Sequence, residues 1–574
     1  MKALFFQGLL AIIAAIPAVA RPHPDSNPDY VIVGGGPAGF VLADQLSQNP
    51  NTQVILLEAG HDGIDDKNIN TPAYYPLISG SFWEYSSQPD PNLDGHAPGL
   101  QQGRVFGGGT AVNGMAYCRG SASLFDEWAQ RSGNPGLAWN SLLEDFKATT
   151  HYTDQPADYP QIVNKSAYGK GPLEVSRVAT GTGFDEPFAQ ALESSLGVHE
   201  VDLNDGTGLG LSKGLQSIRA SNRTRSYARN AFGFRLETRP NVQMISNAWV
   251  QRIGFAGHKA INVTYLDTVS NKVHVLPSKE IIVSSGAINT PKILKLSGVG
   301  PAAELSELGI PVVADIPSVG AQLYDHQFGV VEVEVTSDIM TVWQWATNST
   351  EKALAEEQYK TDASGPLALD NGLLFATFRV PDSVFDGIDG SHYTSLPADR
   401  PHVLMEYSTV PFIATTPNIS TVTAWASLVQ PEAAGTVTLN SSDYRDAPMI
   451  NSNYYGSPAD KAVMLWSYKK LREIMASDPL KSVVIKEWYP GPNVTSDEDV
   501  WSAIQKQSFS FHHPVGTVPI GKSLDKNWRL KGLKGIRVVD SSTFPYPPTC
   551  HPEASVYALA HRAAADIRLA DRRH

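Results

Sequence analysis

Two stretches at opposite ends of the chain carry residues whose types and spacing could do redox chemistry. Near the N-terminus, Gly34, Gly36 and Gly39 have G-x-G-x-x-G spacing, and free backbone N–H groups of a following helix would face a pyrophosphate. Near the C-terminus, His513 lies in the stretch FHHPVGTVPIG, which begins at Phe511. A neutral imidazole, with an ordinary pKa near 6.5, can accept a proton at working pH. A dinucleotide site and a histidine indicate redox chemistry if the two stretches meet in space.

The glycine motif is flanked by elements that would position it. Residues 30–33 read as a buried parallel strand, a helix follows through Val41 and Leu46, and residues 54–57 read as a second strand. That strand ends at Glu58, which could accept hydrogen bonds from the diol of an unphosphorylated adenosine ribose. The motif alone does not separate FAD from NAD, and a glycine-rich turn without a ligand is the alternative.

Three further stretches have recognisable patterns. Residues 103–120, GRVFGGGTAVNGMAYCRG, predict a glycine-rich loop that continues into a helix and is suited to phosphate and ring contacts. Residues 241–253 alternate like one strand. Residues 279–299 predict a strand, a glycine turn and a helix that begins near Thr290 and Pro291.

Length and composition predict two joined domains without nucleic-acid or anionic-membrane partners. The chain has 574 residues, 42% of them hydrophobic, and a formal charge of −13 with no long basic run. Glycine signatures cease between about 320 and 500 and then return. We therefore expect a dinucleotide-binding domain over 27–320, with inserted segments around 140–200, a separate domain over 321–504, and a return to the dinucleotide-binding domain over 505–574.

The N-terminus predicts a secretory signal peptide over residues 1–20. Lys2 precedes an apolar stretch that is shorter than the ~20 residues a membrane span needs, and Ala18-Val19-Ala20 is a small-x-small cleavage site. We therefore expect a secreted, N-glycosylated protein without a membrane anchor. The acceptor sequons lie at Asn164, Asn222, Asn262, Asn348, Asn418, Asn440 and Asn493.

The chain has two cysteines, Cys118 and Cys550. They could form one disulfide in a secreted protein, but a chain of this size does not need one. We favour two free, buried thiols. No metal site is expected, because the sequence has no C-x-x-C or clustered His/Cys spacing, and the neighbours His512 and His513 would point to opposite faces of a strand.

Four ordered blocks of the sequence resemble the glucose-methanol-choline family of FAD oxidoreductases. They are VIVGGGPAG, GRVFGGGTAVNGMAYCRG, GAINTPKILKLSGVG, and FHHPVGTVPIG with GIRVVDSSTFPYPPTCHPEAS. The resemblance covers nearly the whole mature chain, and fungal aryl-alcohol oxidases and dehydrogenases are the members nearest in type. It implies an α/β fold with FAD rather than NAD, in which a Rossmann-like parallel sheet is joined to an antiparallel sheet that roofs the flavin.

The resemblance also implies roles for individual residues. His513 matches the catalytic base, and His551 matches a second active-site position that is His or Asn in the family. His512 matches no catalytic position and is expected to be a pocket wall. The positions that correspond to cofactor contacts are Gly34, Gly36, Gly39 and Glu58 at the ADP half, Gly107, Gly108, Thr110, Asn113 and Gly114 along the pyrophosphate and flavin, Val250 at the adenine, and Asp540 at the flavin.

Two departures from the family pattern affect the expected chemistry. Some members attach FAD through a histidine in the first signature, but this chain has Val112 there, so we expect noncovalent FAD. Aryl-alcohol oxidases carry a tyrosine where this chain has Gly114. The loss of that aromatic wall puts simple benzylic specificity in doubt.

The resemblance implies oxidation of an alcohol by hydride transfer to FAD, with dioxygen or a quinone-type compound as the acceptor. We expect a primary alcohol of an aromatic or secondary-metabolite-like compound. A sugar oxidase or dehydrogenase is one alternative. A non-redox flavoprotein of the hydroxynitrile lyase or cyclising synthase type is another, and a non-catalytic secreted glycoprotein is a third.

Overall fold

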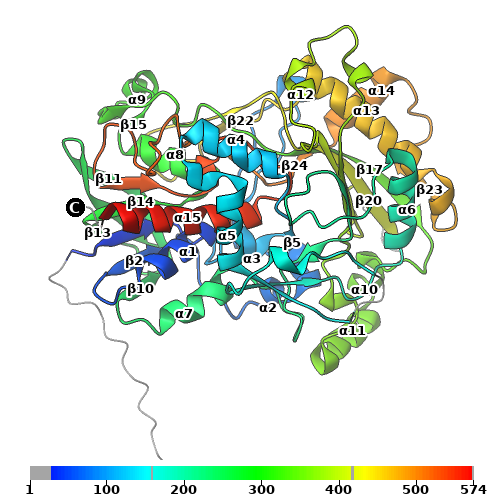
Figure 1. Ribbon diagram of the computed structural model, residues 1–574, viewed down its shortest axis with the longest axis horizontal. Coiled ribbons are helices and arrows are strands. Elements are labelled where there is room, and N and C mark those ends of the chain that lie inside the picture. Colours follow the sequence, from blue (N-terminus) through cyan, green and yellow to red (C-terminus); the bar gives the residue numbers. More distant parts are fainter. Residues whose placement is uncertain (1–26, 157–159, 415–418, 572–574) are drawn as a thin grey trace, which may run out of the picture.

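The structure is a computed structural model that describes residues 27–156, 160–414 and 419–571 (Figure 1). The expected signal peptide, residues 1–20, lies outside the described residues. The sequence predictions of a strand, helix and strand around the glycine motif are confirmed by β1 (Tyr30–Val33), α1 (Pro37–Leu46) and β2 (Val54–Leu57).

These elements belong to a five-stranded parallel sheet with the order β10-β2-β1-β14-β25. Its other strands are β10 (Val242–Ile245), β14 (Glu280–Val283) and β25 (Ile536–Val538). The last strand enters next to β14, so distant parts of the chain build one sheet. The first strands are almost fully buried, as expected for a parallel sheet covered on both faces.

Helices and a small sheet cover this parallel sheet. α15 (Glu553–Asp571) packs along α1, and Figure 1 shows the two helices side by side. A three-stranded antiparallel sheet of β11 (Ala248–Ala256), β12 (Lys259–Asp267) and β13 (Lys272–Pro277) also packs against it, through contacts of β11 with β2 and of β12 with β14. The predicted Rossmann-like arrangement is therefore confirmed.

The prediction of one strand over residues 241–253 is wrong. Asn247 has φ +59°, a left-handed conformation that asparagine tolerates better than most residues. The chain turns there, so β10 stays in the parallel sheet while β11 begins the three-stranded sheet. The alternating pattern continues across the turn and therefore hides it.

The helix predicted to begin near Thr290 begins earlier. α8 (Gly286–Leu296) contains Pro291 in its interior. Proline removes the N–H that would bond to the carbonyl of Ala287, four residues earlier. The hydroxyl of Thr517 donates to that carbonyl at 2.6 Å, so a distant residue supplies the missing hydrogen bond.

A seven-stranded antiparallel sheet forms the second half of the molecule. Its order is β23-β17-β20-β19-β18-β8, and β24 also pairs with β17. The central strands are β17 (Gln327–Val335), β20 (Thr421–Leu428), β19 (Val403–Ser408) and β18 (Phe375–Phe378). The remaining strands are β8 (Gly210–Ser212), β23 (Val484–Tyr489) and β24 (Ser508–Ser510). The predicted second antiparallel sheet is therefore confirmed.

Helices pack on the second sheet, but its strands do not follow the predicted boundaries. α13 (Pro458–Met475) packs on β17 and β20, and α6 (Asp185–Leu196) and α14 (Asp497–Lys506) pack beside it. Because β8 and β24 lie outside residues 321–504, the residue limits of the two domains stay a prediction. Within the described ranges, no helix combines the length and apolar character needed to cross a bilayer.

Candidate functional site

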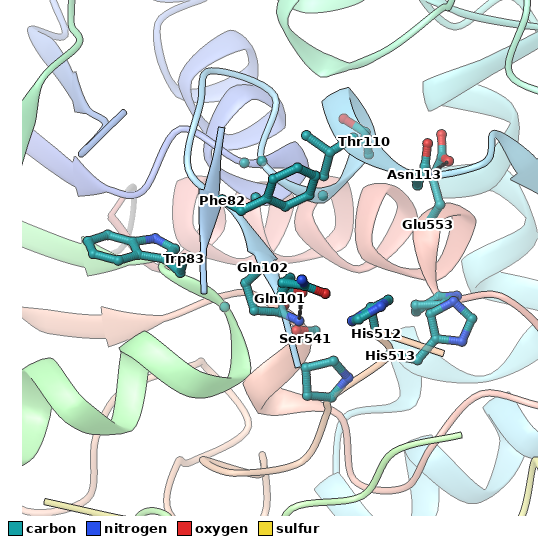
Figure 2. A pocket seen from close by; sticks show the side chains of 18 of the residues that line it. Phe82, Trp83, Gln101, Gln102, Thr110, Asn113, His512, His513, Ser541 and Glu553 are labelled. Carbon is teal, nitrogen blue, oxygen red and sulfur yellow. Dashed lines mark hydrogen bonds between the residues drawn. The ribbon is translucent and has the colours of Figure 1, made fainter. Parts of the chain in front are cut away.

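A cavity of about 680 Å³ takes its lining from both large sheets. Val33 and Leu57 line it from the carboxyl ends of β1 and β2, and Glu406 and Trp425 line it from β19 and β20. Figure 2 shows Trp83 at one end of this cavity and His512 and His513 toward the other. The two stretches singled out in the sequence therefore meet in one cavity.

The glycine motif forms one wall of the cavity. Gly34 has φ +114°, and a Cβ there would lie 2.2 Å from the carbonyl oxygen of Ser284. A Cβ at Gly39 would lie 2.0 Å from the carbonyl oxygen of Gly34, so this glycine allows α1 to pack closely on β1. At Gly36 the nearest atom to an added Cβ would be Gly108 Cα at 4.0 Å. Gly36 thus leaves open space at the N-terminus of α1, which fits a pyrophosphate.

Glu58 lies at the end of β2 and lines the cavity. Its two carboxylate oxygens accept the backbone N–H groups of Gly35 at 2.8 Å and Gly60 at 2.9 Å. Burial raises its pKa to about 7, although these N–H groups and Arg104 act in the opposite direction. Each oxygen keeps further lone pairs, so the carboxylate can still accept a hydrogen bond from a ribose.

A group of aromatic and cationic side chains borders the end of the cavity where Trp83 lies. This group was not predicted from the sequence. The Arg104 guanidinium carbon lies 4.5 Å from the Trp83 ring centroid and 5.2 Å from that of Trp249. Trp249 precedes the predicted adenine-contacting residue Val250 on β11, and both line the cavity. The sequence holds no local signal for this group, because its members come from three separate segments.

The first signature block is fixed to the start of α15. Thr110 lies in the one-turn helix α3 (Gly109–Val112), and Asn113 follows it. Asn113 donates to Glu553 at 2.6 Å and accepts from Arg225 at 2.6 Å. Figure 2 shows Asn113 and Glu553 next to each other. This network holds the loop against the cavity, where Gly108, Thr110, Asn113 and Gly114 form part of the lining.

Asp540 connects β25 to α8. Its carboxylate accepts from the backbone N–H of Gly286 at 2.9 Å, from the Thr290 hydroxyl at 2.6 Å and from the Ser542 N–H at 2.7 Å. Burial raises its pKa. These bonds fix the position of Asp540 at the cavity wall.

Gly39 and Gly107 are the two predicted cofactor positions that do not line the cavity.

The two predicted catalytic histidines converge although 38 positions separate them in the sequence. The rings of His513 and His551 are 5.1 Å apart and nearly perpendicular, at 85°. His513 follows β24, and Phe511 stacks on it at 4.7 Å. His512 has φ +57° and lies beyond the strand, so the prediction that the pair points to opposite faces of a strand is wrong.

A third histidine, His326, was missed. Its Nδ1 lies 3.0 Å from His513 Nδ1, and its side chain is buried. Asp325, next to it, accepts from the backbone N–H of His513 at 3.0 Å and from the hydroxyls of Tyr454 and Ser510. One of these two Nδ1 atoms must donate a hydrogen bond to the other. When His513 carries its ring proton on Nδ1, its Nε2 is free to accept a proton.

His513, His512 and His326 are held neutral by their surroundings. Burial, followed by the neighbouring imidazoles of His326, His551 and His512, lowers the pKa of His513 well below its usual value. Burial also lowers the pKa of His512 to about 4 and that of His326 to about 3. His512 is exposed, and it lines the cavity. These three side chains therefore carry no positive charge over the neutral pH range.

The expectation of two free thiols is wrong, because Cys118 and Cys550 form a disulfide. Their Cα atoms are 6.1 Å apart, within the usual range for this bond. The first signature block and the segment before His551 converge at the cavity, which places the two cysteines together. The backbone N–H of His551 donates to Cys118 Sγ at 3.3 Å.

The space at Gly114 is bounded by an aromatic ring from another segment. A Cβ at Gly114 would lie 3.8 Å from Tyr75 Cζ. Tyr75 belongs to the 3₁₀ helix η1 (Pro72–Leu77) and lines the cavity. Tyr75 therefore supplies an aromatic wall at the place where Gly114 has no side chain.

Comparisons with known proteins identify the family of the chain. Family models described as GMC oxidoreductase match residues 28–328 and 431–560. The chain is 29% identical to the glucose-methanol-choline family oxidoreductase mfmG of Annulohypoxylon moriforme, over 97% of this chain and 96% of the relative. It is 30% identical to patulin synthase of Aspergillus clavatus, over 94% and 91%. An FAD-dependent oxidoreductase from Chaetomium thermophilum is similar in structure, with a TM-score of 0.86, 27% identity, and coverage of 95% of this chain and 100% of that one.

Proposed function

The chain belongs to the GMC oxidoreductase family of FAD-dependent enzymes, and from this premise we propose that it oxidises a primary alcohol to an aldehyde. The observation that carries the proposal is the convergence of His513 and His551, 5.1 Å apart, at a cavity also lined by Gly36 and Glu58. FAD, when bound, supplies the hydride acceptor. Dioxygen or a quinone-type compound is the proposed final acceptor.

The residues of the chain divide the proton chemistry between them. His513 Nε2 takes the hydroxyl proton, while His326 holds the ring through Nδ1. His551 holds the hydroxyl oxygen and steadies the developing alkoxide charge. Gly36, the N-terminus of α1 and Glu58 would hold the ADP half of FAD, and the 107–114 loop would hold the pyrophosphate and flavin.

The proposed substrate carries an aromatic or other large apolar group. Phe328, Phe412, Trp425, Phe509 and Phe511 all line the cavity. The Phe412 and Trp425 rings stack at 5.6 Å, and the Phe328 and Phe511 rings lie 5.0 Å apart. Such surfaces favour planar apolar groups over sugars. Anaerobic bleaching of the flavin across an alcohol panel tests the proposal, and a protein that turns over a substrate without bleaching would be a non-redox flavoprotein instead.

We also propose that the protein is secreted and N-glycosylated. The support is the signal-like N-terminus and the exposure of Asn164, Asn222, Asn348, Asn440 and Asn493. Asn418 lies outside the described residues.

FAD is expected to be released when the protein is denatured. Val112 stands where some relatives carry the linking histidine, and its side chain has no group that can bond to the flavin. Acid precipitation should leave the flavin fluorescence in the supernatant. Fluorescence that stays with the precipitated polypeptide would contradict the noncovalent assignment.

Flavin reduction is expected to keep its full rate as the pH falls from about 8 to below 6.5. Protonation of His513 removes the base, so lower pH slows the reaction, but burial and three neighbouring imidazoles move this pKa well below 6.5. Anaerobic stopped-flow measurements with a substrate that does not ionise would locate the acid limb. A midpoint at or above pH 6.5, with the flavin still bound, would show that another group controls the step.

A further inference from the structure

Side chains and a disulfide, rather than a backbone ladder, hold the segment that carries His551. Residues 545–551 belong to no helix or strand, and three of them are prolines, which have no N–H to donate. Within the described part of the chain, no residue of this segment makes a hydrogen bond between backbone groups. Its position is therefore set by side chains and by covalent bonds.

Two of the side-chain contacts lie at the start of this segment. Trp128 Nε1 donates to the carbonyl of Tyr546 at 3.0 Å. Gln430 Nε2 donates to the carbonyl of Pro547 at 2.9 Å. Both bonds act at least four residues before His551, so they do not fix the backbone at the histidine itself.

The contacts nearest to His551 come from the end of the first signature block. The backbone N–H of Ser121 donates to the Thr549 hydroxyl at 2.9 Å. Cys550 forms the disulfide with Cys118, and the backbone N–H of His551 donates to Cys118 Sγ at 3.3 Å. Cys118 thus holds the residue before His551 by a covalent bond and His551 itself by a hydrogen bond.

The Cys118 side of the disulfide is anchored to regular structure. Cys118 directly follows β5 (Ala116–Tyr117), which pairs with β9 (Leu215–Gln216). Ala116 lines the cavity together with Asn113 and Gly114 of the same block. The disulfide therefore joins the block expected to hold the flavin to the segment that carries His551.

The ring of His551 occupies a confined place at the cavity. It is 8% exposed, and its centroid lies 5.0 Å from that of Phe511 and 5.7 Å from that of Phe375. Its Nε2 lies 3.3 Å from Glu406 Oε2. Misplacement of a reacting group by about 1 Å can lower a rate ~10²-fold. A fixed backbone at His551 is therefore important for any reaction in which its ring takes part.

We propose that the Cys118–Cys550 disulfide positions His551 for alcohol oxidation. The inference rests on the proposed function, in which His551 holds the hydroxyl oxygen of the substrate. The disulfide acts through His551 and transfers neither a proton nor a hydride, since neither cysteine lines the cavity. Without it, the His551 ring loses its fixed position and flavin reduction slows, while FAD stays bound.

The first test asks whether the effect of the disulfide passes through His551. Combining Cys118→Ser with Cys550→Ser removes the covalent bond but keeps side chains of similar size. We expect this double change to slow anaerobic flavin reduction by the best alcohol at least ~10-fold when His551 is present. We expect it to slow the reaction less than about 2-fold in the His551→Ala protein. An equal factor in the two backgrounds would overturn the proposal.

Leu203→Ala is the control for general loosening of this region. Leu203 is fully buried in the same apolar cluster as both cysteines and does not line the cavity. Its truncation should lower the thermal unfolding temperature but change the rate of flavin reduction less than about 3-fold. A loss as large as that of the double serine variant would reject the proposal. Loss of FAD from the double serine variant would also reject it, because the disulfide would then hold the cofactor block instead.

Hydrogen exchange separates this inference from the alcohol oxidation on which it rests. The backbone N–H groups of residues 549–551 would be followed by mass spectrometry with no substrate present. We expect exchange there to become at least ~10-fold faster in the double serine variant, with β25 unchanged. If no alcohol bleaches the flavin but this change is found, the oxidation fails and the positioning of the segment stands. Unchanged exchange over residues 549–551 rejects the inference.

Reduction of the folded holoenzyme tests the same point without any substitution. Dithiothreitol gives two electrons and two protons to the disulfide and becomes a cyclic disulfide itself, which leaves two thiols in the protein. We expect the rate of flavin reduction by the alcohol to fall at least ~10-fold as these thiols appear, with FAD still bound. Two titratable thiols per chain with an unchanged rate would overturn the proposal.

Discussion

Replacing His513 by Asn is expected to slow flavin reduction by the best alcohol at least ~10²-fold, the lower end of what a positioned general base supplies. The amide has no basic nitrogen, whereas the His513 ring is held by His326 Nδ1 and by stacking on Phe511. Because His513 is neutral at working pH, its loss removes the group that receives the hydroxyl proton. Anaerobic stopped-flow bleaching of the oxidised flavin measures the step directly.

His512→Asn is the matched control, since the same change is made at the neighbouring position. Asparagine tolerates the left-handed backbone of His512, at φ +57°, so the substitution adds little strain. His512 lines the cavity but makes no ring hydrogen bond to His326 or His551 among the described residues. We expect less than about a tenfold loss there. A larger loss at His512 than at His513 would mean that the catalytic position has been assigned to the wrong histidine.

The parts of the fold that local pattern determines were predictable. β1, α1 and β2 combine buried apolar strands, a glycine turn and a largely buried apolar helix within a short stretch, so their type is visible in the sequence. The break between β10 and β11 and the early start of α8 were not, because they depend on distant groups. Asn247 donates to the Gly60 carbonyl at 2.7 Å, and Thr517 completes the helix around Pro291.

The candidate site also has residues that the sequence pattern predicts and residues that it does not. The histidines and glycines stand in contiguous blocks, and these blocks were enough to place them. His326 was missed because its position beside His513 depends on the pairing of β17 with β24, which aligns Gln327 with Ser510. The disulfide joins cysteines 432 positions apart, so no local spacing could reveal it.

Replacing Glu58 by Ala is expected to weaken FAD binding by roughly one to two orders of magnitude. A hydrogen bond to a charged carboxylate contributes about 1.5–3 kcal/mol, and about 1.4 kcal/mol corresponds to a tenfold change in Kd. The structure adds a second cost, because the N–H groups of Gly35 and Gly60 would lose their acceptor. Titration of the apoprotein with FAD, followed by quenching of flavin fluorescence, gives the Kd.

The loss of FAD must be separated from the loss of stability that two unpaired N–H groups would cause. Asp44→Ala serves this purpose, because Asp44 is a fully buried acid of α1 that pairs with Arg239 at 2.8 Å and does not line the cavity. Its removal should lower the thermal unfolding temperature, since it leaves Arg239 without its carboxylate, but should leave the Kd for FAD unchanged. Glu58→Ala should instead raise the Kd by more than its change in unfolding temperature accounts for. Equal FAD affinity in Glu58→Ala and Asp44→Ala would show that Glu58 only orders the backbone at Gly35 and Gly60, and that the ribose is held by other groups.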